Sequence, residues 1–120
     1  MRLSVIYDNK NNKAGLPYEI QIVATSFFFK AGYLKAILAN LDQNDYVVYV
    51  RSYKPKKKIA WRLLVKINEI FGELAETKKA TIKHIVFFLN DESEMKLKKY
   101  YQKLGYAKKG DNLIKIFTPS

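Results

Sequence analysis

The sequence predicts an α+β domain in which a mixed, twisted sheet carries helices on both faces. Predicted strands and helices alternate along the chain, in the order strand, strand, helix, strand, helix, strand, helix, strand. With 48% apolar and 14% aromatic residues, a chain of 120 residues can bury a core of its own. No repeat, and no interior linker rich in glycine, proline or serine, divides it. We therefore expect residues 1–120 to form a single domain.

The first third of the chain is expected to contain two strands and a helix. Residues 2–7 form a short apolar run that ends in an asparagine-rich turn signal, and residues 18–25 alternate between apolar and polar side chains, as strands do. From Ser26 the apolar residues recur at spacings of three and four, which is typical of a helical face. This spacing predicts a helix from Ser26 to about Leu41.

The middle of the chain combines two predicted interior strands with an amphipathic helix between them. Residues 45–53 and 82–89 are apolar on both faces over most of their length, which indicates strands that are covered on each side. Between them, one apolar stripe recurs at helical spacing and charged residues occupy the other side, which predicts a helix. The stripe consists of Ile59, Leu63, Ile67, Ile70, Phe71 and Leu74.

The C-terminal part is predicted to contain a third helix, from about Asp91 to Leu104. Asp91 and Glu94 have the spacing of a capping box at its start. Gly105 can end the helix, because glycine readily takes the left-handed conformation just past a last turn. Residues 112–118 then supply the last predicted strand.

The composition excludes several classes of chemistry. Without cysteine, the chain can form no disulfide, no thiolate metal site and no cysteine nucleophile. With one histidine, His84, it cannot build the zinc sites that need several histidines. The N-terminus lacks an apolar stretch of signal-peptide length, and no window approaches the roughly 20 apolar residues of a membrane span. We therefore expect a cytoplasmic protein without a metal site or a membrane partner.

The chain is strongly basic, with 22 Lys and Arg against 11 Asp and Glu and a net charge of +11. Only three of these bases are arginines: Arg2, Arg51 and Arg62. Lysine is a mobile point charge that favours diffuse attraction to phosphates over the two-pronged reading of guanine edges by arginine. Two interpretations stay open. The charge attracts a polyanionic partner, or it only keeps the protein soluble and reflects an A/T-rich coding bias.

The start of the amphipathic helix is the first candidate site. Pro55 suits a first helical position, because its missing N–H is not needed there. Lys56, Lys57 and Lys58 follow, and each places a cation at the positive end of the helix dipole, which is unfavourable by roughly 0.3–1 kcal/mol. A bound anion would relieve this conflict, so the turn is a candidate phosphate site. The alternative is that the helix starts later and the lysines are simply solvated.

Tyr101, in the C-terminal helix, is the second candidate. It lies on the same predicted helical face as Leu97 and Leu104, which favours a core aromatic residue with its hydroxyl at the edge. A positioned phenol can also donate a proton in a transition state, which suits a leaving group that departs as an anion. Both interpretations stay open on the residues alone.

The C-terminal helix and strand resemble a known family. The run LKKYYQKLGY at 97–106, followed by the strand NLIKIF, is similar to the LYxKxGF motif of GNAT-superfamily N-acetyltransferases. The strand, basic loop and helix at 45–76 and the strand at 82–89 also repeat the order of that family's acetyl-CoA-binding core. The resemblance covers about residues 45–118 and implies a GNAT-like fold for the domain.

The predicted pyrophosphate loop departs from the family's pattern. That loop usually reads Gln/Arg-x-x-Gly-x-Gly/Ala, and the corresponding residues are Pro55, Lys58 and Ala60, of which only Ala60 matches. Glycine lets a backbone approach a phosphate closely, whereas Lys58 projects a side chain near it. Either lysine ammonium groups replace some backbone contacts, or this copy of the fold has lost coenzyme A.

The resemblance implies transfer of an acetyl group from acetyl-CoA, as cosubstrate, to an unidentified amine acceptor. It implies that the strand at 45–53 pairs with the pantetheine arm and that Tyr101 protonates the departing thiolate. The residues that it places at the coenzyme are Tyr53, Lys56, Lys57, Lys58, Ile59 and Ala60. The general base stays open among Asp45, Asp91 and His84, although the apolar strand around His84 favours a hydrogen-bonded core histidine.

A rival interpretation is a catalytically inactive, basic GNAT-like module that binds nucleic acid or another polyanion. Residues 51–58 and 95–110 hold 11 of the 22 basic residues, and in the predicted fold both segments can flank one groove. The tyrosines among them could stack on unpaired bases: Tyr53, Tyr100, Tyr101 and Tyr106. No DNA- or RNA-reading motif accompanies them. A combined interpretation, in which the acyl acceptor is a nucleic acid or a protein bound to one, also stays open.

Overall fold

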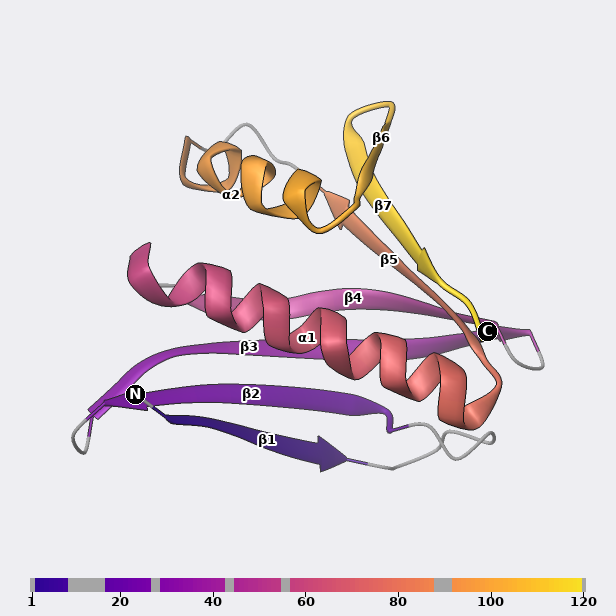
Figure 1. The fold of residues 1–120 in the computed structure, drawn as a ribbon, viewed down its shortest axis with the longest axis horizontal. Coiled ribbons are helices and arrows are strands. Elements are labelled where there is room, and N and C mark those ends of the chain that lie inside the picture. Colours follow the sequence, from indigo (N-terminus) through magenta and orange to yellow (C-terminus); the bar gives the residue numbers. More distant parts are fainter. Residues whose placement is uncertain are drawn as a thin grey trace.

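In the computed structural model, the chain folds into one seven-stranded sheet with two helices packed against it (Figure 1). The structure describes residues 2–8, 17–26, 29–42, 45–54, 57–87 and 92–119. The strands lie in the order β1-β2-β3-β4-β5-β7-β6. The strand bounds are β1 Arg2–Asp8, β2 Glu19–Ser26, β3 Phe29–Asp42, β4 Asp45–Lys54, β5 Thr81–Phe87, β6 Ala107–Lys109 and β7 Asn112–Phe117. The helices are α1, Lys57–Lys78, and α2, Glu92–Lys103.

The first four strands form an antiparallel meander, which corrects one sequence prediction. The helix predicted from Ser26 to Leu41 is wrong, because the described part of this segment is strand β3, paired with β2 on one side and β4 on the other. Leu34, Ala36 and Leu38 are fully buried at the two-residue period of a strand. Apolar residues on the opposite face fill the gaps between them, so a strand that is apolar on both faces imitates helical spacing.

The remaining predicted elements are confirmed within a few residues. The strands predicted at 2–7, 18–25, 45–53, 82–89 and 112–118 correspond to β1, β2, β4, β5 and β7, although residues 88–89 lie outside the described ranges. The central helix and the C-terminal helix correspond to α1 and α2. Asp91 lies outside the described residues, so the predicted capping box is not part of the described structure.

Strands β4 and β5 run parallel but separate after a short paired stretch. Their register begins at Asp45↔Thr81 and ends at Val48↔His84, whereas β4 continues to Lys54 and β5 to Phe87. Figure 1 shows β5 diverging from β4 beyond this point. We call the Val48↔His84 pair the splay point. Beyond it, β4 keeps its partner β3, and no strand of the described residues pairs with its other edge, which we call the free edge of β4.

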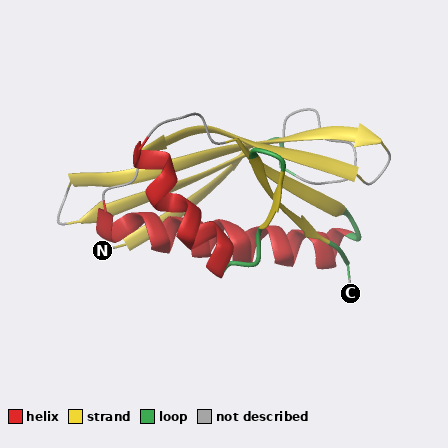
Figure 2. Ribbon diagram, turned by 90° about the horizontal axis from the view of Figure 1, so that it is seen from above, coloured by secondary structure: helices red, strands yellow, loops and turns green. Residues whose placement is uncertain are grey.

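The core lies between the sheet and its helices. Both helices pack on the same face, because Phe71 of α1 and Tyr101 of α2 each contact the ring of His84 in β5. Figure 2 shows α1 running below the strands. The α+β class and the mixed sheet are as predicted, and the described helices lie on one face because the predicted helix before residue 42 is a strand. Of the described helices, none combines the length and apolar character of a membrane span.

Candidate active site

A helix end positions the first side chains of the candidate site. Gly105 has φ of 94°, its N–H donates to Gln102 O, and the Tyr106 N–H donates to Tyr101 O, both at 3.1 Å. This is a Schellman motif, which confirms the predicted glycine stop. Because the motif turns the chain back on the helix, the Tyr106 ring lies 5.1 Å from the Tyr101 ring, measured between centroids. The two tyrosines of the motif therefore form one aromatic pair.

Tyr106 joins a buried group of polar side chains that come from different elements. Its hydroxyl lies 2.6 Å from His84 Nδ1 and accepts a hydrogen bond of 3.1 Å from Asn68 Nδ2. Lys115 Nζ donates to Asn68 Oδ1 at 3.0 Å and to the Leu104 carbonyl at 2.6 Å. A continuous chain of hydrogen bonds thus runs from Lys115 in β7, through α1, to His84 in β5. We call these four side chains the polar chain.

Burial sets the charge state of these groups. His84 is fully buried, and the loss of hydration lowers its imidazole pKa to about 3, so the ring is neutral around physiological pH. Burial raises the pKa of Tyr106, the Asn68 hydrogen bond opposes this rise, and the hydroxyl stays protonated. Burial also lowers the pKa of Lys115, which is only partly covered. The prediction of a hydrogen-bonded core histidine at position 84 is confirmed.

Tyr101 lies beside the polar chain. It is 4% exposed, and its ring is edge-on to that of His84 with 6.2 Å between centroids. Its neighbour in sequence, Tyr100, packs edge-on against Trp61 of α1 at 5.5 Å and so holds α2 to α1. Tyr101 is therefore a core aromatic residue, and it lies next to the splay point through its contact with His84.

The other end of the candidate site is the start of α1. The helix begins at Lys57 and has no acidic residue in its first turn, so the alternative of a later helix start is excluded. Lys56 lies outside the described residues, and so do the side chains of Tyr53, Lys57 and Lys58. The side chains of Ile59 and Ala60 are buried, at 8% and 2% exposure, so these two residues present only backbone groups to a ligand.

Three features of the structure fit an acyl-coenzyme A. The free edge of β4 beyond Val48 carries backbone groups that can pair with an extended amide-containing arm. The strand leads to the N-terminus of α1, and the dipole and first N–H groups of a helix suit phosphates. At the splay point, His84 Nε2 is a buried nitrogen without a hydrogen-bond partner in the described structure. The residues present therefore suit all three parts of such a molecule.

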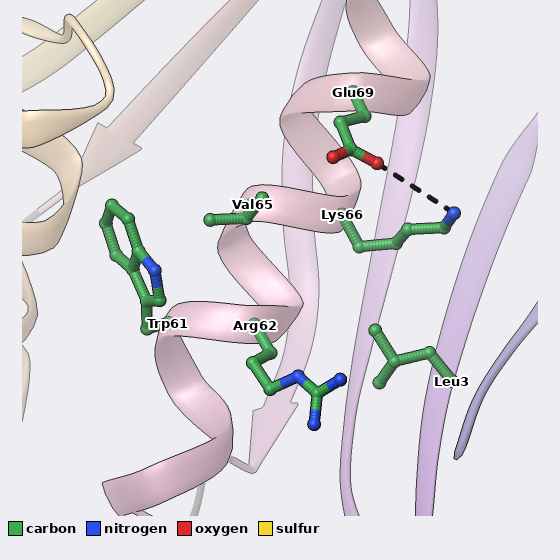
Figure 3. A pocket seen from close by; sticks show the side chains of 6 residues that line it. All are labelled: Leu3, Trp61, Arg62, Val65, Lys66 and Glu69. Carbon is green, nitrogen blue, oxygen red and sulfur yellow. Dashed lines mark ion pairs between the residues drawn. The ribbon is translucent and has the colours of Figure 1, made fainter. Parts of the chain in front are cut away.

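Other surfaces are less suited to this chemistry. A groove lies between α1 and Leu3 of the edge strand β1, where Lys66 Nζ and Glu69 Oε2 are 3.9 Å apart (Figure 3). It is lined by Leu3, Trp61, Arg62, Val65, Lys66 and Glu69, none of which belongs to the predicted site. Within the described ranges, no three His, Asp or Glu side chains gather as a metal site. We therefore place the candidate active site at the splay point.

Sequence reasoning missed Asn68 and Lys115. Asn68 interrupts the buried face of α1 between Leu64 and Phe71. Lys115 lies between buried Leu113 and Phe117 on the same face of β7. A polar residue at a core position is the signal that would have found both, because a buried polar group needs a partner. Of the three candidate bases, Asp45 is exposed at the start of β4 and Asp91 lies outside the described residues.

Comparison with solved structures identifies the fold. Aminoglycoside 6′-N-acetyltransferase from Enterococcus faecium is similar with a TM-score of 0.56 and 16% identity, over 100% of this chain and 99% of that one. A protein assigned to the GNAT family of acetyltransferases, from Desulfovibrio desulfuricans, gives 0.55 and 11%, over 83% and 68%. An aminoglycoside 6′-N-acetyltransferase complexed with coenzyme A gives 0.53 and 16%, over 87% and 76%. The chain thus has the GNAT acetyltransferase fold, as the tyrosine-glycine motif implied.

The comparisons by sequence are negative. No protein-family model and no curated protein sequence matches the chain. The family resemblance therefore depends on the arrangement of the sheet and on the motif around Tyr101 and Gly105.

Proposed function

We propose that the protein is an acetyl-CoA-dependent N-acetyltransferase that acts on a primary or secondary amine. The observation that carries this proposal is the separation of β4 from β5 after Val48↔His84, which leaves a free strand edge leading to a helix N-terminus. A strand edge pairs with amide groups, and a helix N-terminus attracts phosphate, in the order in which they follow each other in coenzyme A.

The proposed binding mode assigns a role to each predicted residue. Tyr53, near the end of β4, flanks the pantetheine arm, and Lys56, Lys57 and Lys58 hold the pyrophosphate with their ammonium groups. Ile59 and Ala60 line this turn through their backbone, because their side chains are buried. Lysine side chains in this way replace the close backbone contacts that glycines make in the family's usual loop.

We propose Tyr101 as the proton donor to the departing thiolate. Its support is its place in the tyrosine-glycine motif and its contact with His84, at the splay point. A tyrosine phenol is ordinarily protonated at neutral pH, which is the form that can donate. The amine acceptor and its base are not assigned. None of the structural relatives supports the nucleic-acid-binding alternative, and we do not propose it.

The test of this function is ligand binding. Acetyl-CoA should raise the melting temperature of the wild-type protein, because a ligand that binds only the folded state stabilises it. Lys57→Glu and Lys58→Glu should abolish the rise, whereas Lys108→Glu, the same charge change on the exposed strand β6, should keep it. A wild-type protein whose melting temperature does not move at millimolar acetyl-CoA would contradict the proposal. An equal loss in Lys108→Glu would show that only net charge matters.

A further inference from the structure

The direction of each hydrogen bond in the polar chain can be worked out from Lys115, because an ammonium group can only donate. Lys115 Nζ donates to Asn68, so the atom that it contacts is the carbonyl Oδ1, and the amide nitrogen faces the other way. That nitrogen donates its two hydrogens to Leu64 O at 3.0 Å and to the Tyr106 hydroxyl at 3.1 Å. The Tyr106 oxygen accepts from Asn68, and its own hydrogen is paired only if it points along the 2.6 Å contact to His84 Nδ1. The reverse direction would leave this hydrogen without an acceptor among the described hydrogen bonds, so we infer that Tyr106 donates to His84.

This direction fixes the tautomer of the imidazole. His84 Nδ1 accepts the Tyr106 hydrogen, so the single proton of the neutral ring must lie on Nε2. His84 Nε2–H is thus a donor, fully buried and without a hydrogen-bond partner in the described structure. It cannot take a proton from an amine, which argues against His84 as the general base.

An unpaired buried donor is unfavourable unless something accepts its hydrogen. The cost is about 1–3 kcal/mol, so such a group is a candidate for contact with an acceptor on a ligand when other observations place a ligand beside it. Every other polar group in the chain from Lys115 to His84 is paired. The O–H and N–H dipoles from Lys115 onward all point the same way. This alignment strengthens the His84 Nε2–H donor at the end of the polar chain and favours an acceptor that carries negative charge.

The unpaired Nε2–H lies at the splay point, beside the residue that the proposed function assigns to proton donation. His84 belongs to the last paired residues of β4 and β5, and its ring contacts that of Tyr101. In the proposed binding mode, the pantetheine arm follows the free edge of β4 from the start of α1 and brings the acyl group to the splay point. The distance along β4 from Lys54 to Val48 is roughly 20 Å at about 3.3 Å for each residue, which an extended arm has to span.

We propose that His84 Nε2–H donates a hydrogen bond to the carbonyl oxygen of the bound acyl thioester, with Tyr106, Asn68 and Lys115 as its positioning residues. This inference rests on the proposed acetyltransferase function. When an amine adds to the thioester, the carbon–oxygen double bond becomes a single bond and the oxygen gains negative charge, which a fixed donor stabilises. No proton moves to or from His84. When the carbon–sulfur bond breaks, the electron pair on the oxygen re-forms the double bond and the negative charge leaves on the sulfur, which takes a proton from Tyr101 in the proposed function. The proton of the attacking amine passes to the unassigned base.

The single histidine makes this proposal directly measurable. In an NMR spectrum of protein labelled with ¹⁵N-histidine, the only ring-nitrogen resonances come from His84. In the free protein we expect an unprotonated Nδ1 and a proton on Nε2. Saturating acetyl-CoA should shift the Nε2–H proton resonance downfield. Adenosine 3′,5′-bisphosphate, which would occupy only the nucleotide end of the site, should leave this resonance unchanged. Coenzyme A, which lacks the thioester carbonyl, should not reproduce the shift.

The outcomes separate this inference from the proposed function. If acetyl-CoA does not change the melting temperature, the function itself fails. If acetyl-CoA binds but the Nε2–H resonance stays in place, only the role of His84 fails. The same shift with coenzyme A would overturn the assignment to the carbonyl oxygen, and a proton on Nδ1 in the free protein would overturn the proposed tautomer.

A variant pair gives a second readout that does not require the amine acceptor. In His84→Leu, the preference for acetyl-CoA over coenzyme A should fall about 2–10-fold, the equivalent of one net hydrogen bond. Tyr46→Phe is the matched control, because it removes the other buried polar atom without a described partner, the Tyr46 hydroxyl, and should keep the preference. His84→Gln, which carries an N–H donor, should restore part of it. An unchanged preference in a folded His84→Leu protein would overturn the proposal.

Discussion

The two ends of the candidate active site differ in how they relate to the stability of the fold. At the splay point, polar side chains of α1, β5 and β7 are joined through Tyr106 by hydrogen bonds inside the core, and only His84 Nε2 among them has no described partner. At the start of α1, neighbouring lysines occupy the positive end of a helix dipole that has no acidic residue in its first turn. The first end should stabilise the free protein, and the second should weaken it until an anion binds. Substitutions at the two ends are therefore expected to change the free energy of unfolding in opposite directions.

The largest effect is expected for Asn68→Ala, in the middle of the polar chain. The change removes the acceptor of Lys115 and the donor to Tyr106, and it leaves a small cavity in α1. We expect the free energy of unfolding to fall by about 2–4 kcal/mol, measured by urea denaturation. Gln102→Ala, an exposed amide on α2, is the control and should change stability by less than about 0.5 kcal/mol. A loss in Asn68→Ala as small as this would mean that the polar chain does not support the fold.

An intermediate effect is expected from the titration of His84. Its pKa is about 3 in the folded protein against an ordinary value of 6.5, so between these values the unfolded state binds more protons. The contribution is fully present above the unfolded pKa and is lost as the pH falls toward the folded pKa. From about pH 7.5 to pH 5 it amounts to about 2 kcal/mol, at 1.36 kcal/mol for each pH unit in the steep range.

The matching measurement is urea denaturation of the wild-type protein and of His84→Leu at several pH values in this range. The stability of the variant should depend less on pH by about that amount, even if the variant is less stable throughout. Parallel pH profiles would contradict the buried, neutral histidine that the polar chain requires.

The sequence was sufficient where one pattern had one explanation. The apolar stripe of α1, the left-handed Gly105 after α2 and the doubly apolar strand β4 all appear as predicted. The helix predicted before residue 42 is wrong, because the residues of this segment are apolar at both strand and helix spacings. Pairing of β3 with strands on both sides decides its structure, and such long-range pairing is absent from a local pattern.

The same limit applies to the candidate site. Lys57 and Lys58 could be proposed as site residues because they break a local rule of helix termini, and Tyr101 because it belongs to a contiguous motif. The polar chain could not be assembled in this way, because its contacts join residues that are 22, 38 and 47 positions apart. The interruptions at Asn68 and Lys115 indicate that partners are needed, but only the fold shows which partners they have.

The smallest effect, and the one of opposite sign, is expected for Lys58→Glu in the absence of ligand. An acidic side chain in the first turn of α1 interacts favourably with the helix dipole, so the free energy of unfolding should rise by about 0.3–1 kcal/mol at low ionic strength. Lys108→Glu makes the same change in net charge on strand β6 and corrects for the relief of general repulsion. If Lys58→Glu is no more stable than this control, the lysines do not oppose the helix, and the argument that they are kept for a phosphate loses its physical basis. If it is more stable and has also lost its response to acetyl-CoA, the free protein gives up stability at this turn for binding, whereas the polar chain at the splay point serves both.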